Sequence, residues 1–189
     1  MTEKALEAKK ASNPGATLSQ ADADQQQQYL TFSLGEEMFA IGILAIREIL
    51  EYGQLTEVPM TPPFIRGVIN LRGAVVPVID LSVRFGRQAR AVSKRTCIVI
   101  IETEVMGSHD ADGPRQTQQM GVVVDAVSEV LEIPTAEIEP PPAFGARIRT
   151  DFIRGMGKVA GKFVVILDVA RVLSLDEVAV LAAVQAEAA

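Results

Sequence analysis

One phrase occurs twice in this chain, and its repetition constrains the fold more than any other feature of the sequence. Residues 64–81 read FIRGVINLRGAVVPVIDL and residues 152–169 read FIRGMGKVAGKFVVILDV, with identical residues at seven of eighteen positions. Upstream of each phrase stands a matching segment, AIREIL at 45–50 and AVSEVL at 126–131. The same segments in the same order indicate two copies of one structural unit.

Both copies consist of short apolar runs that favour β-strands. Runs such as YLTFSL, AVVPVID, TCIVIIE and MGVVVDAV are rich in Val and Ile and are separated by Gly, Pro or polar residues. Each copy would hold an opening hairpin, the A-[IV]-x-E-[IV]-L segment, a connector containing Pro, a second hairpin and a closing Asp. This predicts an all-β fold of two pseudo-repeated five-stranded β-barrels, packed together and joined by short helical turns.

The repeated region is flanked by two segments of different character. Residues 1–28, which end in ADADQQQQ, contain few large apolar side chains, so we expect a disordered N-terminal tail. Residues 29–173 form the β domain. Residues 174–189 change to helical spacing, with Ser174 and Glu177 as a capping box, and predict a C-terminal helix packed on the barrels.

Residues that the two copies share have local structural explanations. We expect Gly67 and Gly155 each to end a single helical turn in a left-handed conformation. We expect Asp80 and Asp168 each to cap a helix that follows an apolar strand. Because copies of a unit share what the fold needs, exposed residues that differ between the copies are better candidates for function.

Arg72 is the main candidate of this kind. The first hairpin tip reads Asn70-Leu71-Arg72-Gly73, whereas the second reads KVAG, so Gly73 is expected to supply a positive φ and Arg72 has no counterpart. On a rigid hairpin Arg72 would present a multi-donor cation that binds a partner's carboxylate through two hydrogen bonds. The alternative is an arginine that is only solvated.

Glu48 allows more than one interpretation. On an extended segment it shares a face with Ile46 and Leu50, so it is an edge charge, a buried and satisfied carboxylate, or a contact residue. Its twin in the second copy, Glu129, favours a structural role.

Composition excludes several classes of function. A net charge of −6, two tyrosines and no tryptophan argue against nucleic acid as a partner. No run approaches the roughly 18 to 20 apolar residues of a membrane span, so we expect no membrane insertion and a cytoplasmic location. The single cysteine, Cys97, is expected to be a buried thiol. The basic run from Arg84 to Arg95 is interpreted as a solvated linker.

The sequence contains no recognisable catalytic, metal or cofactor motif. The single histidine, His109, lies in a polar stretch, residues 107–119, which reads as a hairpin loop. The fragment DADG in that loop departs from the calcium-loop pattern, and no glycine-rich phosphate cradle follows a strand. We therefore expect no catalysis, no cofactor and no metal. A small-ligand-binding or enzymatic barrel that uses the loop around His109 is the alternative from another class.

The hairpin YLTFSLGEEMFAI, the segment ILAIREIL, and the runs TPPFIRGVINLRGAVVPVIDL and GVVVDAVSEVLEI together resemble the CheW family of chemotaxis coupling proteins. The resemblance spans residues 29–173. It implies a non-catalytic adaptor that binds the cytoplasmic tip of a chemoreceptor and the regulatory domain of the chemotaxis histidine kinase, and that is recruited to membrane-bound receptor arrays. The same role in a chemosensory system that does not control swimming stays open.

The resemblance also implies partner-binding roles for particular residues. The NLRG turn and the REI segment match family positions that bind partners. This assigns the role to Arg72 and Glu48, with Gly67, Asn70 and Leu71 nearby.

Overall fold

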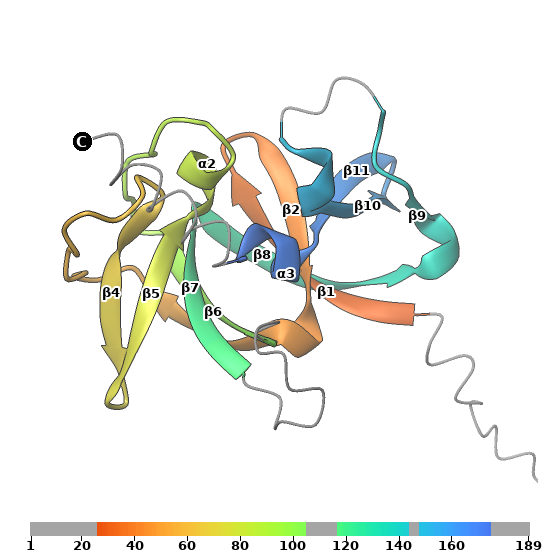
Figure 1. Cartoon of the computed structure of the whole chain (residues 1–189). Coiled ribbons are helices and arrows are strands. Elements are labelled where there is room, and N and C mark those ends of the chain that lie inside the picture. Colours follow the sequence, from red (N-terminus) through yellow and green to blue (C-terminus); the bar gives the residue numbers. More distant parts are fainter. Residues whose placement is uncertain (1–25, 105–116, 144–147, 175–189) are drawn as a thin grey trace, which may run out of the picture.

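The computed structural model describes residues 26–104, 117–143 and 148–174, which form an all-β domain of two sheets (Figure 1). The five-stranded sheet has the order β3 (Ile46–Glu51), β6 (Cys97–Glu104), β7 (Thr117–Val124), β5 (Ala74–Asp80) and β4 (Ile65–Leu71). The six-stranded sheet has the order β8 (Ala126–Pro134), β1 (Gln26–Leu34), β2 (Glu37–Gly42), β11 (Lys162–Leu167), β10 (Ile153–Val159) and β9 (Ile138–Glu139). The predicted all-β class is confirmed.

Short helical turns connect the strands in the described part of the chain. They are η1 (Ile43–Ala45), α2 (Leu81–Arg84), η2 (Thr135–Glu137), η3 (Thr150–Phe152) and α3 (Val169–Val172). The predicted caps are present, because Asp80 accepts a hydrogen bond from the Val83 amide and Asp168 accepts one from the Arg171 amide, each at 3.2 Å. These carboxylates satisfy amides that a helix start leaves unpaired.

Each sheet curls into a small barrel. In the six-stranded sheet the edge strands β8 and β9 are joined directly by η2, so one continuous stretch of chain bends around the barrel. In the five-stranded sheet the chain leaves β3 and Thr56 forms a bridge with Val68 of β4, the opposite edge strand. We call the five-stranded sheet the first barrel and the six-stranded sheet the second barrel.

The two copies of the repeat exchange their opening hairpins. The first barrel contains β3, β4 and β5 of the first copy together with β6 and β7, which open the second copy. The second barrel contains β8 to β11 of the second copy together with β1 and β2, which open the first. The parallel pairs β5–β7 and β11–β2 join the exchanged hairpins to their hosts. The expectation that each copy supplies all the strands of its own barrel is therefore wrong, because hairpin and host come from different copies.

The sequence predicted that the shared glycines Gly67 and Gly155 end helical turns, and this prediction is wrong. Both lie inside strands, β4 and β10, next to a register shift in the pairing. A Cβ on Gly67 would stand 2.5 Å from the Thr56 carbonyl oxygen, and one on Gly155 would stand 2.5 Å from the Ile138 side chain. Glycine recurs here because the returning chain crosses each strand too closely for any side chain.

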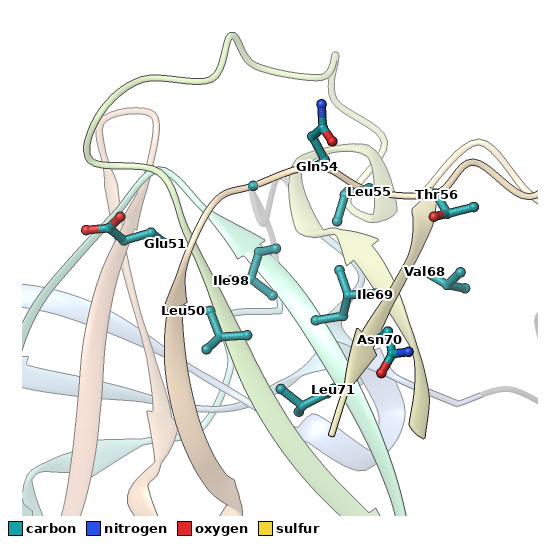
Figure 2. A pocket seen from close by; sticks show the side chains of 11 residues that line it. Leu50, Glu51, Gln54, Leu55, Thr56, Val68, Ile69, Asn70, Leu71 and Ile98 are labelled. Atoms are coloured by element: carbon teal, nitrogen blue, oxygen red, sulfur yellow. The ribbon is translucent and has the colours of Figure 1, made fainter. Parts of the chain in front are cut away.

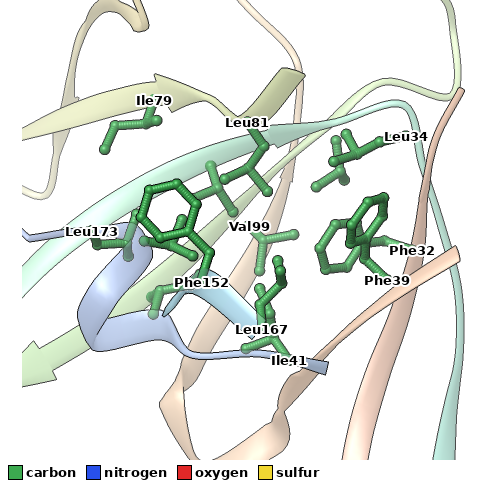
Figure 3. Close-up of a cluster of buried hydrophobic side chains, with 14 of the residues drawn as sticks. Phe32, Leu34, Phe39, Ile41, Ile79, Leu81, Val99, Phe152, Leu167 and Leu173 are labelled. Atoms are coloured by element: carbon green, nitrogen blue, oxygen red, sulfur yellow. The ribbon is translucent and has the colours of Figure 1, made fainter. Parts of the chain in front are cut away.

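The largest hydrophobic cluster lies between the two barrels and unites both copies (Figure 3). Phe32 and Phe39 come from the exchanged hairpin, Val99 from the first barrel, and Phe152 and Leu167 from the second copy. Burying one such large side chain stabilises the fold by roughly 1.5–3 kcal/mol. Two smaller clusters fill the barrels themselves, one around Val78 and Ile100 and one around Tyr29 and Ile133.

Several predicted boundaries move in the structure. Strand β1 begins at Gln26, so residues 26–28 belong to the sheet, where they pair with Glu132 to Pro134. Strand β7 begins at Thr117, which shortens the predicted loop. Residues 1–25, the loop residues 105–116 with His109, and the predicted helix from residue 175 lie outside the described residues.

The basic linker is held by ion pairs. Arg87 pairs with Glu37 of β2, and Arg90 pairs with Asp125 at 2.7 Å. Asp125 also accepts a hydrogen bond from the Gly35 amide at 2.7 Å. The linker between the two copies is thus paired directly with β2 and, through Asp125 between β7 and β8, with the turn at Gly35, so it is not simply solvated. Cys97, at the end of the linker, is half-buried and not fully buried.

Candidate functional site

Two charged residues that the sequence singled out separately lie together at the open seam of the first barrel. Glu48 belongs to the edge strand β3, and Arg72 occupies the tip of the β4–β5 hairpin at the opposite edge. Arg72 Nη1 lies 2.7 Å from Glu48 Oε1, and Nη2 lies 3.1 Å from Oε2. This two-pronged contact, which we call the fork, links the two edges of the barrel.

The fork is exposed to partners. The Arg72 side chain is 77% exposed and the Glu48 side chain is 25% exposed. The hydrogen bonds from Arg72 to Glu48 raise the pKa of the guanidinium above its ordinary value, so the cation persists at every physiological pH. A surface ion pair of this kind contributes little to folding. The fork instead presents two charges in a fixed orientation at the surface.

The turn that carries Arg72 is built to hold it outward. Arg72 has φ 51° and Gly73 has φ 86°, the pair of positive angles typical of a tight type I′ hairpin turn. The Asn70 side chain accepts a hydrogen bond from the Gly73 amide at 2.9 Å. The predicted positive φ at Gly73 is confirmed, and Asn70 shapes the tip from within the turn.

A groove of about 880 Å³, lined by both apolar and polar side chains, lies at the seam between β3 and β4 (Figure 2). Leu50 of β3, Ile69 and Leu71 of β4 and Ile98 of β6 point into it. Leu71 directly precedes Arg72, so the fork borders the groove. The site combines an apolar floor with charges at its rim, the composition typical of a protein-binding surface.

The predicted neighbour Gly67 is placed differently. It is buried beneath the returning chain at Thr56 and offers no exposed atom beside the fork. Leu71 lines the groove and Asn70 shapes the turn, so these two and Gly67 each have a different local role. The other two candidates, Arg72 and Glu48, form the fork.

The face that Glu48 occupies also differs from expectation. A register shift between Ile46 and Glu48 turns the strand, so Ile46 packs against the cluster between the barrels while Leu50 packs against the interior of the first barrel. Glu48 therefore shares a face with Leu50 and not with Ile46. Strict alternation along IREIL could not reveal this bulge, because a bulge inserts one residue without a residue-type signature.

The twin Glu129 does not reproduce the fork. Glu129 is exposed on β8, and the position equivalent to Arg72 in the second barrel is Ala160. Ala160 has φ 50°, so the turn is the same and only the cation is missing. The fork is a feature of the first barrel alone, which separates it from what the repeated fold requires.

Exposed apolar side chains near the seam were not identified from the sequence. Leu44 of η1 is 95% exposed, and Ile49 of β3 is 43% exposed. Both lie within four residues of Glu48. Ile49 reaches the surface because β3 is an edge strand of the first barrel.

Two further ion pairs lie on the surface away from the groove. Arg47 Nε donates to Glu102 at 2.9 Å, and Arg149 Nε donates to Asp151 at 3.0 Å. Hydrogen bonds from these arginines lower the pKa of Glu102 and of Asp151. Within residues 26–104, 117–143 and 148–174 no group of three or more potential ligands is placed to hold a metal ion. No helix in this part of the chain has the length and hydrophobicity that a membrane span requires.

Comparison with known proteins gives one consistent result. A model of the CheW-like domain matches residues 28–177. The chemotaxis protein CheW of Klebsiella aerogenes is 36% identical over 153 residues, which cover 81% of this chain and 85% of that protein. Protein FrzA of Myxococcus xanthus is 32% identical over 141 residues, covering 75% and 80% of the two chains.

A solved structure agrees with these relatives. The scaffolding protein TtCheW from Thermoanaerobacter tengcongensis superposes with a TM-score of 0.67 at 37% identity, covering 78% of this chain and 88% of that one. Both its fold and its sequence therefore match this chain over the two barrels. The chain belongs to the CheW-like family of chemotaxis proteins.

Proposed function

We propose that this protein is a non-catalytic adaptor that couples the cytoplasmic tip of a chemoreceptor to the chemotaxis histidine kinase. The observation that carries the proposal is family membership across the whole two-barrel domain, with relatives named as chemotaxis and scaffolding proteins. The protein acts by binding two partners at once, in the cytoplasm, where membrane-bound receptor arrays recruit it. No substrate is converted.

The site geometry supports a protein partner. The groove along the seam offers apolar side chains beside polar ones, as a surface that binds a segment of another protein does. Arg72 and Glu48 at its rim offer one cation and one carboxylate in fixed geometry. A partner surface with complementary charges would gain orientation from the fork and affinity from the groove.

Co-purification tests the proposal. A tagged receptor cytoplasmic fragment and, separately, the regulatory domain of the kinase are expected to retain the full chain, and all three are expected to form a ternary complex. The control for variants of the fork is Lys162→Ala, which removes an exposed cation from β11 of the second barrel. Failure of both fragments to retain the wild-type protein would contradict the adaptor role.

A second candidate keeps the adaptor role but changes the pathway. The similarity to protein FrzA, a relative whose name is not that of a chemotaxis protein, favours a chemosensory system other than swimming as the alternative. Deleting the gene and scoring swimming and surface spreading separately distinguishes the two. A defect confined to surface spreading would support the alternative.

A further inference from the structure

One arginine side chain is held between equivalent residues of the two repeats. The guanidinium carbon of Arg84 lies 4.9 Å from the ring centre of Phe64 and 4.7 Å from that of Phe152. Phe64 and Phe152 occupy the same position in the two copies, and both are buried. Arg84 therefore stacks between the two copies at the place where their matching residues approach each other.

The contact is made from one side only. Arg84 is the last residue of α2, and its equivalent in α3 is Val172. Arg84 Nε donates a hydrogen bond to the Val172 carbonyl oxygen at 3.0 Å. Valine has no donor with which to make the reciprocal contact. Arg84 thus makes a contact between the copies that Val172, its equivalent, does not return.

The stack continues into the second barrel. Arg149 lies over the Phe152 ring, with its guanidinium carbon 4.6 Å from the ring centre. Phe85, next to Arg84, stacks on Phe39 of the exchanged hairpin with ring centres 5.6 Å apart and contacts Phe152 at 6.0 Å. Groups from β2, α2 and η3 are therefore in continuous contact through the residues around Arg84.

We propose that Arg84 is a positioning residue that sets the orientation of one barrel relative to the other. The hydrophobic effect is non-directional, so a directional contact restricts the angle between the barrels further than burial of the cluster between them does. A planar guanidinium that stacks on two rings and donates to a fixed carbonyl is directional and admits few arrangements. In the adaptor proposed above, this angle fixes how a partner on the first barrel is placed relative to a partner on the second.

The test measures the barrel orientation directly in the free protein. Spin labels are attached at Ala74→Cys and Lys162→Cys, equivalent exposed positions of the two hairpins, in a Cys97→Ser background. Double electron–electron resonance then gives the distribution of distances between the labels. Arg84→Met keeps the apolar length of the side chain but removes the charge and the donor, and Arg95→Met is the matched control.

We expect Arg84→Met to broaden or shift the distance distribution, while Arg95→Met leaves it as in the wild type. Arg84→Lys, which keeps the charge but not the planar fork, is expected to give an intermediate distribution. An unchanged distribution in Arg84→Met would overturn the proposal. If Arg84→Met does not fold, Arg84→Lys decides, and a distribution identical to the wild type in that variant would equally overturn it.

A binding readout separates this inference from the adaptor role on which it partly rests. Arg84→Met is expected to bind the receptor fragment and the kinase domain individually within roughly twofold of wild type, yet to lose most receptor control of kinase activity. Full receptor control despite an altered distance distribution would refute the claim that the angle matters to coupling. If the wild-type protein binds neither fragment, the adaptor proposal fails. The distance distributions still decide whether Arg84 sets the orientation of the barrels.

Discussion

Replacing Gly67 with Ala tests whether this residue contacts a partner or only permits the fold. The added Cβ would stand 2.5 Å from the Thr56 carbonyl oxygen and 3.3 Å from the Leu55 Cβ, at a backbone φ of 148°. Overpacking costs about 1–3 kcal/mol, and a side chain in a backbone region used almost only by glycine costs a further ~1–3 kcal/mol. We expect a loss of about 3 kcal/mol in the free energy of unfolding.

Thermal unfolding followed by circular dichroism measures this loss. For a chain of this size, 3 kcal/mol lowers the Tm by roughly 6–12 °C. Gly155→Ala is expected to act similarly, because its Cβ would meet Ile138 at 2.5 Å in the second barrel. Gly53→Ala is the control, since nothing lies within 4 Å of its Cβ. A Gly67→Ala variant with wild-type Tm and weakened partner binding would refute this reasoning and make Gly67 a contact residue.

Three further predictions follow from the same structure. Arg72→Ala and Glu48→Ala should each weaken partner binding by roughly 30-fold in a pull-down titration, as loss of an interface hot spot does. The Tm of both variants should be almost unchanged. A strongly lowered Tm in Glu48→Ala would show instead that this carboxylate is structural. Asp168→Ala should cost about 1 kcal/mol through the lost helix cap, seen as a Tm lowered by roughly 2–4 °C, and an unchanged Tm would refute the cap. Because Glu102 and Asp151 have folded-state pKa values below their unfolded values, their contribution is present above an unfolded pKa of about 4. It is lost as pH falls through the folded pKa, so the Tm should drop on acidification below about pH 4; a Tm that is independent of pH there would contradict this.

The repeat let the sequence predict the fold class but not the pairing of strands across copies. The repeated phrase, which begins at Phe64 in the first copy and at Phe152 in the second, marks equivalent hairpins because identical residues pack in the same way in both copies. Which hairpin pairs with which edge depends on contacts between residues far apart in the chain, such as Val165 with Phe39 and Val78 with Gly121. Local patterns do not encode such pairings, because the exchanged and unexchanged arrangements bury the same faces of the same strands.

The candidate site, too, could be predicted only in part from the sequence. Comparing the copies isolated Arg72 correctly as the exposed residue without a counterpart, and the turn chemistry around it is as predicted. That its guanidinium meets Glu48 could not be predicted, because the two residues lie on opposite edges of the sheet and meet only when the barrel curls. The predicted structural role of Gly67, ending a helical turn, was wrong because the backbone at Thr56, which it accommodates, is brought close by the same curvature.

The two repeats also show how a symmetric fold acquires an asymmetric function. Positions that both barrels need are the same, as at Asp80 and Asp168, whose carboxylates cap equivalent helices. At two positions where the copies differ, the first copy carries an arginine and the second a small or apolar residue: Arg72 against Ala160, and Arg84 against Val172. Arg72 faces Glu48 at the outer seam, and Arg84 donates across to the second copy at the inner interface. At the hairpin tips this difference leaves the backbone alike, since Arg72 and Ala160 have φ angles of 51° and 50°. An adaptor needs this combination, since two similar barrels that presented identical surfaces would not distinguish two different partners.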